Sequence, residues 1–220
     1  MFQNFKLIFK MRTPIATNSE INFDALLSFC ICKKETCENF FVFSGKQDDL
    51  EDLDLNILDE KFGVYTASSG IGYYREFFGS WKKQFCYEND NLIDFRNVKK
   101  RIDIGCGHFK AYNMPLELRA YENILFYVRG DKEKILDLIN NHLFNIGKKA
   151  SQGFGEINEF EAVDMEEDYS IFKDGRLMRP IPMTEETVNE CLHRNTKFRI
   201  ILRPKKPPYW RQDCLVKCIF

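Results

Sequence analysis

Two successions of a β-strand and an α-helix, with a glycine-rich loop after the second helix, predict an α+β domain of the ferredoxin-like type. The predicted strands of these units are residues 5–11 and 124–129. The loop, Gly147 to Gly155, leads into a further strand at residues 154–163. We expect residues 1–220 to form a single elaborated domain, with an inserted β-hairpin at about residues 45–115 and a C-terminal extension.

The first half of the module begins with a strand and a helix. Residues 5–11 are apolar with some alternation and contain no strand breaker, and the stretch around Pro14 ends them. Asn22 or Asp24 can cap a helix that carries the apolar residues after it. A second strand can begin at residues 40–43.

The insertion contains an acidic run and a cluster of large aromatic side chains. The acidic run at residues 48–60 is expected to be a solvated surface. The aromatic residues between Tyr73 and Trp81 allow two interpretations: they can stack on nucleic-acid bases, or they can fill the core. We expect most of them in the core, because large aromatic side chains dominate buried area.

Basic residues and a Gly-x-Gly turn at residues 96–112 form a second candidate site. Arg101 precedes the turn, and His108, Lys110 and Tyr112 follow it. This pattern suits a hairpin that lies along phosphates. His108 also permits metal-independent RNA cleavage by general acid–base catalysis, although a single histidine is more often a packing or hydrogen-bonding residue.

The second half of the module ends in the glycine-rich loop. Residues 116–120 and 124–129 have the composition of strands. Asp131 can cap a helix that runs from Lys132 to about Ile146, because apolar residues recur there at helical spacing. A strand at residues 154–163 follows the loop.

The loop itself favours binding of a polyanion such as an RNA backbone. Glycines at three of its positions permit positive φ angles and close approach of another backbone. The loop also carries charged and neutral donors: Lys148, Lys149, Ser151 and Gln152. It is neither a nucleotide-binding P-loop nor a dinucleotide fingerprint, because it follows a helix and lacks the Gly-Lys-Ser/Thr ending. The alternative is a helix C-cap at Gly147 followed by a flexible turn.

The C-terminal part carries arginines and a rigid basic segment. Asp174-Gly175 is a turn signal with Arg176 and Arg179 close after it, and residues 179–182 are stiff and extended. Residues 198–202 are expected to be a strand. Residues 205–211 combine basic groups with two aromatic rings on a proline-rich backbone, either as an interaction surface or as a packed tail.

Composition limits the classes of protein to which the chain can belong. The net charge of -1 argues against a protein that coats nucleic acid indiscriminately, although acidic and basic residues are segregated along the chain. No apolar run is long enough for a membrane span, and a cytoplasmic location is the default. The eight cysteines lack the paired spacing of a zinc site, so we expect buried, reduced thiols, no metal ion and no cofactor.

Several of these stretches resemble the RAMP superfamily of CRISPR-associated proteins. The loop Gly147-Lys148-Lys149-Ala150-Ser151-Gln152-Gly153-Phe154-Gly155 is similar to the superfamily's signature loop. Residues 22–27 are similar to the opening helix of several members. Residues 169–182, which contain Asp-Gly-Arg and Arg-Pro-Ile-Pro, and Pro-Pro-Tyr-Trp at residues 207–210 resemble the type IV subunit that caps the 5′ end of the guide RNA.

The resemblance implies a non-catalytic subunit that grips the 5′ handle of the guide RNA and seats neighbouring CRISPR backbone and large subunits. Target DNA near the flanking motif is a further partner that it leaves open. The expected RNA-binding residues are Lys148, Lys149, Ser151, Gln152, Gly153, Phe154, Arg101, His108, Lys110, Tyr112, Arg176 and Arg179. Two alternatives stay open: a metal-independent endoribonuclease that uses His108 to process precursor guide RNA, and a structural interaction module without RNA of its own.

Overall fold

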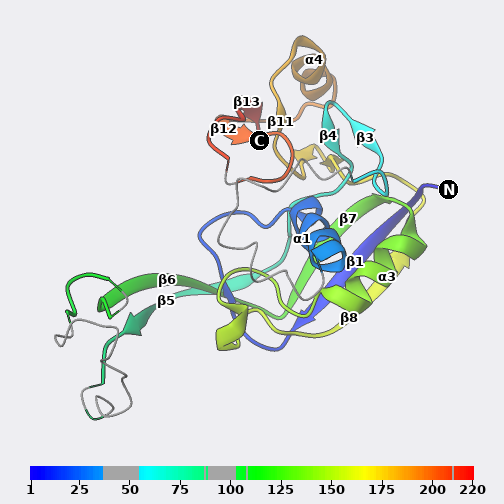
Figure 1. Cartoon of the computed structure of the whole chain (residues 1–220). Helices are drawn as coiled ribbons and strands as arrows, with labels where there is room; N and C mark the ends of the chain where they lie inside the picture. The colour runs from blue at the N-terminus through cyan, green and yellow to red at the C-terminus, as the bar shows by residue number, and fades with distance from the viewer. Residues whose placement is uncertain (37–54, 87, 89–102, 108, 210) are drawn as a thin grey trace.

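The structure is a computed structural model that describes residues 1–36, 55–86, 88, 103–107, 109–209 and 211–220. Within these residues the protein is a mixed α/β structure whose strands pair in small antiparallel sheets (Figure 1). The strand predicted at residues 40–43 and much of the acidic run lie outside the described residues, as do Arg101 and His108.

A three-stranded antiparallel sheet of order β7-β1-β8 lies at the centre of the molecule. Its strands are β1 (Gln3–Met11), β7 (Asn123–Gly130) and β8 (Ile157–Asp164). The strands predicted at residues 5–11, 124–129 and 154–163 correspond to these three, with small differences at their ends. Alternate residues of β1 and β7 point to the same face and are buried there: Phe5, Leu7, Phe9, Ile124, Phe126 and Val128.

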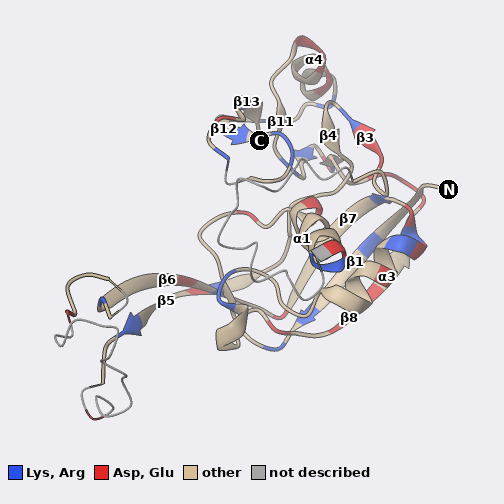
Figure 2. Ribbon diagram, in the orientation of Figure 1, with Lys and Arg blue, Asp and Glu red and all other residues tan. Residues whose placement is uncertain are grey.

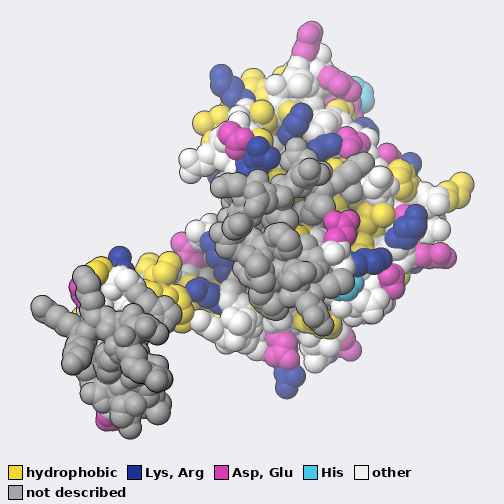
Figure 3. Space-filling model, viewed as in Figure 1, with side chains coloured by type: hydrophobic (Ala, Val, Ile, Leu, Met, Phe, Trp, Pro, Cys, Tyr) yellow, Lys and Arg dark blue, Asp and Glu magenta, His cyan; other side chains and the backbone are white. Residues whose placement is uncertain are grey.

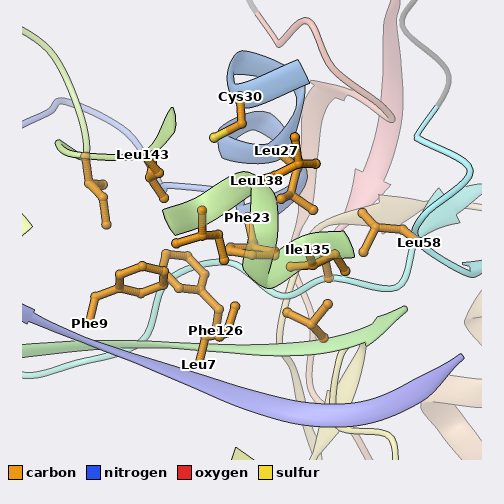
Figure 4. Packing of buried hydrophobic residues seen from close by; sticks show 14 of the residues in the cluster. Leu7, Phe9, Phe23, Leu27, Cys30, Leu58, Phe126, Ile135, Leu138 and Leu143 are labelled. Atoms are coloured by element: carbon orange, nitrogen blue, oxygen red, sulfur yellow. The ribbon is translucent and has the colours of Figure 1, made fainter. Parts of the chain in front are cut away.

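Two helices cover this apolar face of the sheet (Figure 1). They are α1 (Phe23–Thr36) and α3 (Lys132–His142). Figure 4 shows their side chains packed above the strands, with Phe23 of α1 beside Phe126 of β7. The centroids of these two rings are 5.3 Å apart, and Ile135 of α3 belongs to the same buried cluster. Burial of this apolar area is the main force that holds the helices on the sheet.

The second helix is shorter than its sequence pattern predicts. Asp131 caps its N-terminus by accepting a hydrogen bond from the Lys134 amide, as expected. The helix ends at His142 rather than near Ile146. The Ile146 amide instead donates to the Gly155 carbonyl at 2.8 Å. Pairing between two separate parts of the chain therefore replaces the last turn that the periodicity predicts.

The outer edge of β7 is covered by residues 66–71. The Ser68 amide donates to the Tyr127 carbonyl at 2.9 Å, and Ile71 and Leu125 exchange hydrogen bonds of 2.9 and 2.8 Å. These residues thus lie beside β7 as a fourth, irregular edge of the sheet. The chain order is β1, α1, this edge, β7, α3 and β8.

A long hairpin, here called the arm, projects from the body (Figure 1). It consists of β5 (Tyr74–Lys83) and β6 (Tyr112–Tyr121), and β6 also pairs with the short β2 (Ile15–Ala16) in the body. Aromatic residues in and next to the arm are exposed: the exposed fraction is 100% for Tyr73 and 75% for Phe78. The expectation that most of this cluster belongs to the core is wrong, because the hairpin leaves the body.

The C-terminal part forms a second, smaller core together with residues 60–65. Its elements are β3 (Glu60–Lys61), β4 (Val64–Tyr65), β9 (Phe172–Lys173), β10 (Arg176–Leu177), β11 (Ile181–Pro182), α4 (Glu185–His193), β12 (Ile200–Pro204) and β13 (Leu215–Ile219). The predicted turn at Asp174-Gly175 is confirmed, since φ is +49° and +70° at these residues. The strand predicted at residues 198–202 is β12, which begins and ends slightly later.

The cysteines and helices of the described residues bear on three expectations drawn from composition: buried thiols, a metal site and a membrane span. Cys30, Cys32, Cys191 and Cys218 are buried, whereas Cys86, Cys106 and Cys214 are exposed, so the rule of buried thiols holds in part. Among the described residues, no group of three or more His, Cys, Asp or Glu side chains could hold a metal ion. Nor does any helix in those ranges have the length and apolarity needed to cross a membrane.

Candidate nucleic-acid interface

The glycine-rich loop depends on glycine at three positions. The φ angle is +91° at Gly147, +83° at Gly153 and +67° at Gly155. Gly155 is the most tightly packed, because a Cβ atom there would lie 1.8 Å from the carbonyl oxygen of Ile146. The expected use of glycine for positive φ and for close backbone approach is therefore confirmed.

Backbone hydrogen bonds attach the loop to β2. The C-cap residue of α3 is Leu143, so the interpretation of Gly147 as its C-cap is wrong. Instead, the Lys148 amide donates to the Ala16 carbonyl at 2.8 Å, and Ala16 pairs with Leu118 of β6. The loop therefore extends the sheet that carries the arm and is held beside the base of the arm.

Lysines and aromatic rings meet where the loop faces the arm. The Nζ atom of Lys149 lies 3.5 Å from the centroid of the Trp81 ring, and the Trp81 and Tyr112 centroids are 4.8 Å apart. The Nζ atom of Lys83 lies 5.9 Å from the Tyr112 centroid. Such contacts are cation–π interactions, which hold a cation over a ring face. We name Lys148, Lys149, Trp81, Lys83 and Tyr112 the loop–arm surface.

The figures show the surroundings of this surface. In Figure 2 the ribbon is blue, the colour of Lys and Arg, where the loop reaches the base of β5 and β6. Figure 3 shows hydrophobic side chains along the arm next to dark-blue basic side chains at its base. The base of the arm is also fastened to the body, because the Arg119 guanidinium donates to the Ser19 carbonyl at 3.3 Å and lies over the Tyr74 ring.

The two loop lysines keep their charge available to an anion. The Nζ atom of Lys148 donates to the neutral Asn18 side chain at 2.7 Å. Among the described residues, neither Lys148 nor Lys149 forms an ion pair with a carboxylate, whereas Lys10 pairs with Glu159. A ligand phosphate would therefore not have to displace an internal carboxylate partner.

The other predicted residues of the loop lie at or near its surface: Ser151, Gln152, Gly153 and Phe154. The Gln152 and Gly153 amides donate within the loop, to the carbonyls of Lys149 and Ala150 at 2.9 Å each. The hydrogen bonds of these two amides are therefore made within the loop. The exposed side chains of Ser151 and Gln152 remain as neutral donors.

A pocket of about 680 Å³ opens beside the loop, between α3 and β8. Its lining includes Phe144, Asn145 and the loop residue Ala150, together with Glu156 and Glu159. Among the described residues, the lining contains no lysine or arginine that could attract a phosphate, and its charged side chains are carboxylates. An anionic chain is better placed against the loop–arm surface than in this pocket.

The second predicted site is described only in part. Tyr112 belongs to the loop–arm surface through its contact with Trp81. Lys110 is exposed just before the start of β6. Arg101 and His108 lie outside the described residues.

The two predicted arginines have different positions. Arg176 is exposed on β10, in a separate two-stranded sheet. Arg179 has an exposed fraction of 1% and forms an ion pair of 3.0 Å with the buried Asp24. Arg179 also donates to the Ala67 carbonyl at 2.9 Å and to the Tyr209 hydroxyl at 2.8 Å. The structure therefore places Arg179 in the interior rather than at a surface where it could hold a phosphate, and both terminal nitrogens of its guanidinium donate to groups of the protein itself.

Tyr209 completes this buried network. Its hydroxyl donates to Oδ2 of Asp24 at 2.6 Å. Burial raises the pKa of Tyr209 well above its usual value, and the Asp24 carboxylate raises it further. The phenol therefore stays protonated as a donor. Burial opposes the charge of Arg179, but Asp24 and Tyr209 raise its pKa, so the guanidinium stays charged.

Sequence reasoning misses two members of the loop–arm surface. Trp81 and Lys83 lie in an aromatic and basic stretch but are not among the residues expected at the site. The available signal is the succession Trp81-Lys82-Lys83, which places Trp81 and Lys83 on one face of a strand. Nothing local in the sequence indicates that this face meets Lys149.

Comparisons with known proteins agree with these motifs. The family model for "CRISPR type IV associated protein Csf3" matches residues 60–219, which is most of the chain. A search of curated proteins gave no match. The matched range includes the arm, the glycine-rich loop and the C-terminal part, so the expectation of a type IV CRISPR-associated protein is confirmed: the chain belongs to the Csf3 family of CRISPR type IV associated proteins.

Proposed function

We propose that this chain is the guide-RNA-binding subunit of a type IV CRISPR ribonucleoprotein and that it grips the repeat-derived 5′ handle without catalysing a reaction. The observation that carries the proposal is the meeting of Lys149 with Trp81 and Tyr112 beside the glycine-rich loop. Cations and ring faces in one place match the two parts of a single-stranded nucleic acid, its phosphates and its bases. Family membership supports a role in a type IV complex.

The arrangement of the elements is consistent with a ferredoxin-like RAMP module. The chain order of strands and helices has two β-α units, and the sheet order β7-β1-β8 is extended beyond β7 by residues 66–71. The loop follows α3, the last helix before β8. In this interpretation the arm is the inserted hairpin of the module, and the C-terminal part is its extension.

Each part of the loop–arm surface has a separate role in the proposal. Lys148 and Lys149 neutralise phosphates, and Ser151 and Gln152 add neutral donors. Trp81 and Tyr112 stack on bases of the handle, each stacked base contributing about 1–3 kcal/mol. Since these contacts read shape and charge more than base edges, we expect them to position the RNA rather than to select its sequence.

The same proposal assigns the partners. A handle held at the loop–arm surface would leave the C-terminal part free to contact the neighbouring backbone and large subunits of the complex. Target DNA near the flanking motif is a further candidate partner of the exposed arm, which carries the aromatic residues Tyr74, Phe77 and Phe78.

Charge reversal in the loop tests the proposal. We expect Lys149→Glu, alone and with Lys148→Glu, to lower the amount of guide RNA that co-purifies with the complex about tenfold or more. Each reversal replaces an attraction to phosphate by a repulsion. The matched control is Lys61→Glu, since Lys61 is also an exposed lysine over an aromatic ring, Phe62, but lies on β3.

The outcomes separate this function from its alternatives. Guide RNA retained at the wild-type level in the double variant would contradict the proposal. Protein that carries no protected RNA after nuclease treatment, even in the wild-type complex, would favour a structural interaction module. Cleavage of repeat RNA in EDTA that is lost in His108→Ala would favour the endoribonuclease.

A further inference from the structure

β12 is an edge strand that presents apolar side chains to solvent. It pairs with β13 on one side, and among the described residues no strand pairs with its other side. The exposed fractions of Ile200 and Leu202 are 57% and 62%, and Leu215 of β13 is also exposed, at 45%. The register places these residues on one face of the sheet.

The register also shows which backbone groups of β12 are directed outward. Arg199 and Phe220 exchange two hydrogen bonds, of 2.8 and 3.0 Å. Hydrogen-bonded and non-hydrogen-bonded pairs alternate along an antiparallel ladder. Ile200 and Leu202 are therefore at non-hydrogen-bonded positions, and their N–H and C=O groups point away from β13.

The hydrogen bonds of β13 on its other side agree with this register. Lys217 lies opposite Leu202, and its carbonyl accepts a hydrogen bond of 2.8 Å from the Met183 amide next to β11. Because the Lys217 carbonyl points to β11, the backbone of Leu202 has no partner on β13. Two successive outward positions, Ile200 and Leu202, are the pattern that an added strand requires.

Two other sheet edges in the described chain, β11 and β8, are less suited to an added strand. β11 is short and ends in Pro182, and a proline cannot donate to a ladder. β8 carries Glu159, Glu161 and Asp164, and charged side chains on an edge discourage pairing. In β12, the residues from Ile200 to Leu202 are neither charged nor proline, and Arg203 and Pro204 come only at the end of the strand.

The exposed charged side chains that flank β12 are mainly basic. Exposed basic side chains lie before, after and beside the strand: Lys197, Arg199, Lys205 and Lys217. Among the described residues, none of these four forms an ion pair with a carboxylate, whereas Arg203 pairs with Glu20 at 2.8 Å. An incoming segment would therefore be favoured by acidic side chains next to apolar ones.

We propose that β12 seats a neighbouring protein subunit by accepting an extended segment of it as an additional strand, and that this segment alternates apolar and acidic residues. Ile200 and Leu202 would supply the backbone hydrogen bonds and the apolar contact. The surrounding lysines and arginine would select acidic side chains. The proposal rests on membership of a multi-subunit complex and deepens the function proposed above, but it does not depend on the RNA contacts of the loop.

Amide hydrogen exchange on the full chain tests the added strand. We would compare the chain alone with the complex assembled from the co-expressed type IV subunits. The Ile200 and Leu202 amides should exchange at least about tenfold more slowly in the complex, because they acquire acceptors. The Ile201 amide, which already faces β13, should change less than about twofold. Unchanged exchange at Ile200 and Leu202 would overturn the proposal.

A pair of substitutions at Leu202 adds a second readout. Leu202→Pro removes an outward N–H without removing a β12–β13 hydrogen bond, whereas Leu202→Thr keeps this N–H. We expect Leu202→Pro to weaken binding of the protein subunits about tenfold more than Leu202→Thr, with guide RNA still bound to the chain. Thermal unfolding of both variants checks that the fold is retained.

The outcomes identify the occupant of the edge. If Leu202→Pro and Leu202→Thr weaken binding of the protein subunits equally, the proposal is overturned, because the outward N–H of residue 202 would then not contribute to binding. Loss of RNA with the protein subunits retained would assign the edge to nucleic acid. Loss of self-association in sedimentation experiments would assign it to a second copy of the chain. By contrast, loss of RNA in Lys149→Glu with the subunits still bound would leave the strand proposal intact.

Discussion

Arg179 is the residue whose position differs most from its expected role. It lies in a stretch that looks like an RNA-binding segment, yet its guanidinium is buried against Asp24 and Tyr209. These residues come from the three separate stretches that carry the resemblance to CRISPR-associated proteins outside the loop, at residues 22–27, 169–182 and 207–210. The motifs therefore include residues that hold the first helix and the C-terminal part together.

A substitution in this network should affect stability strongly. We expect Asp24→Ala to lower the free energy of unfolding by about 3–5 kcal/mol, because it leaves the buried charge of Arg179 without its ion-pair partner. Tyr209→Phe keeps the ion pair and should cost about 1–2 kcal/mol for the lost hydroxyl. Urea unfolding of both variants measures the difference, and equal costs would show that the ion pair is not the important interaction.

At the scale of single elements, the glycine-rich loop shows that a glycine in the sequence predicts backbone conformation but not packing. Gly147, Gly153 and Gly155 all have positive φ, which the sequence predicts from residue type. Their surroundings differ, since a Cβ atom at Gly155 would collide with the Ile146 carbonyl, whereas one at Gly153 would have no neighbouring atom within 4 Å. Residue type predicts the conformation, but only packing decides which glycine is irreplaceable.

The matched substitutions Gly155→Ala and Gly153→Ala test this difference. Gly153→Ala should cost about 1 kcal/mol, the penalty for a left-handed alanine. Gly155→Ala should cost about 3 kcal/mol or more, because the methyl group also forces Ile146 and the loop apart. Urea unfolding measures both costs, and we expect only Gly155→Ala to reduce guide retention substantially. Similar stability of the two variants would mean that the loop can move without penalty.

The arm is the element that the sequence predicts least well. β6 alternates apolar and polar residues, which is typical of a strand, whereas β5 does not, and the aromatic residues of β5 would also suit a buried strand. Phe78 is exposed although nothing adjacent to it in the sequence distinguishes it from a core residue. The long projection of β5 and β6 from β2, not their composition, leaves these faces uncovered.

At the scale of the whole molecule, a net charge of -1 is compatible with RNA binding because the charges are separated. The acidic residues near the loop, Glu156 and Glu159, pair with Arg12 and Lys10. The loop–arm surface has no such internal neutralisation at Lys149 within the described residues. A local basic surface can therefore exist on a nearly neutral protein.

The salt dependence of RNA binding should reflect this limited surface. With about two phosphate contacts, from Lys148 and Lys149, the slope of log K against log salt should be about −1.4 for single-stranded RNA. Filter binding of the handle RNA between low and moderate salt measures it. Lys149→Glu should make the slope shallower by about 0.7. A slope several times steeper in the wild type would indicate a much larger basic interface.

The sequence by itself determined the periodic and conformational features of this protein: the central strands, the two packed helices, the left-handed turn at Asp174-Gly175 and the glycine-dependent loop. These depend on side-chain spacing and residue type within one segment, so local patterns predict them. The tertiary structure alone decided that Arg179 is internal, that the helix after Asp131 stops early, and that Lys149 meets Trp81. Each of these features results from contacts between segments that are far apart in the sequence. A local sequence pattern carries no information on which distant segments meet.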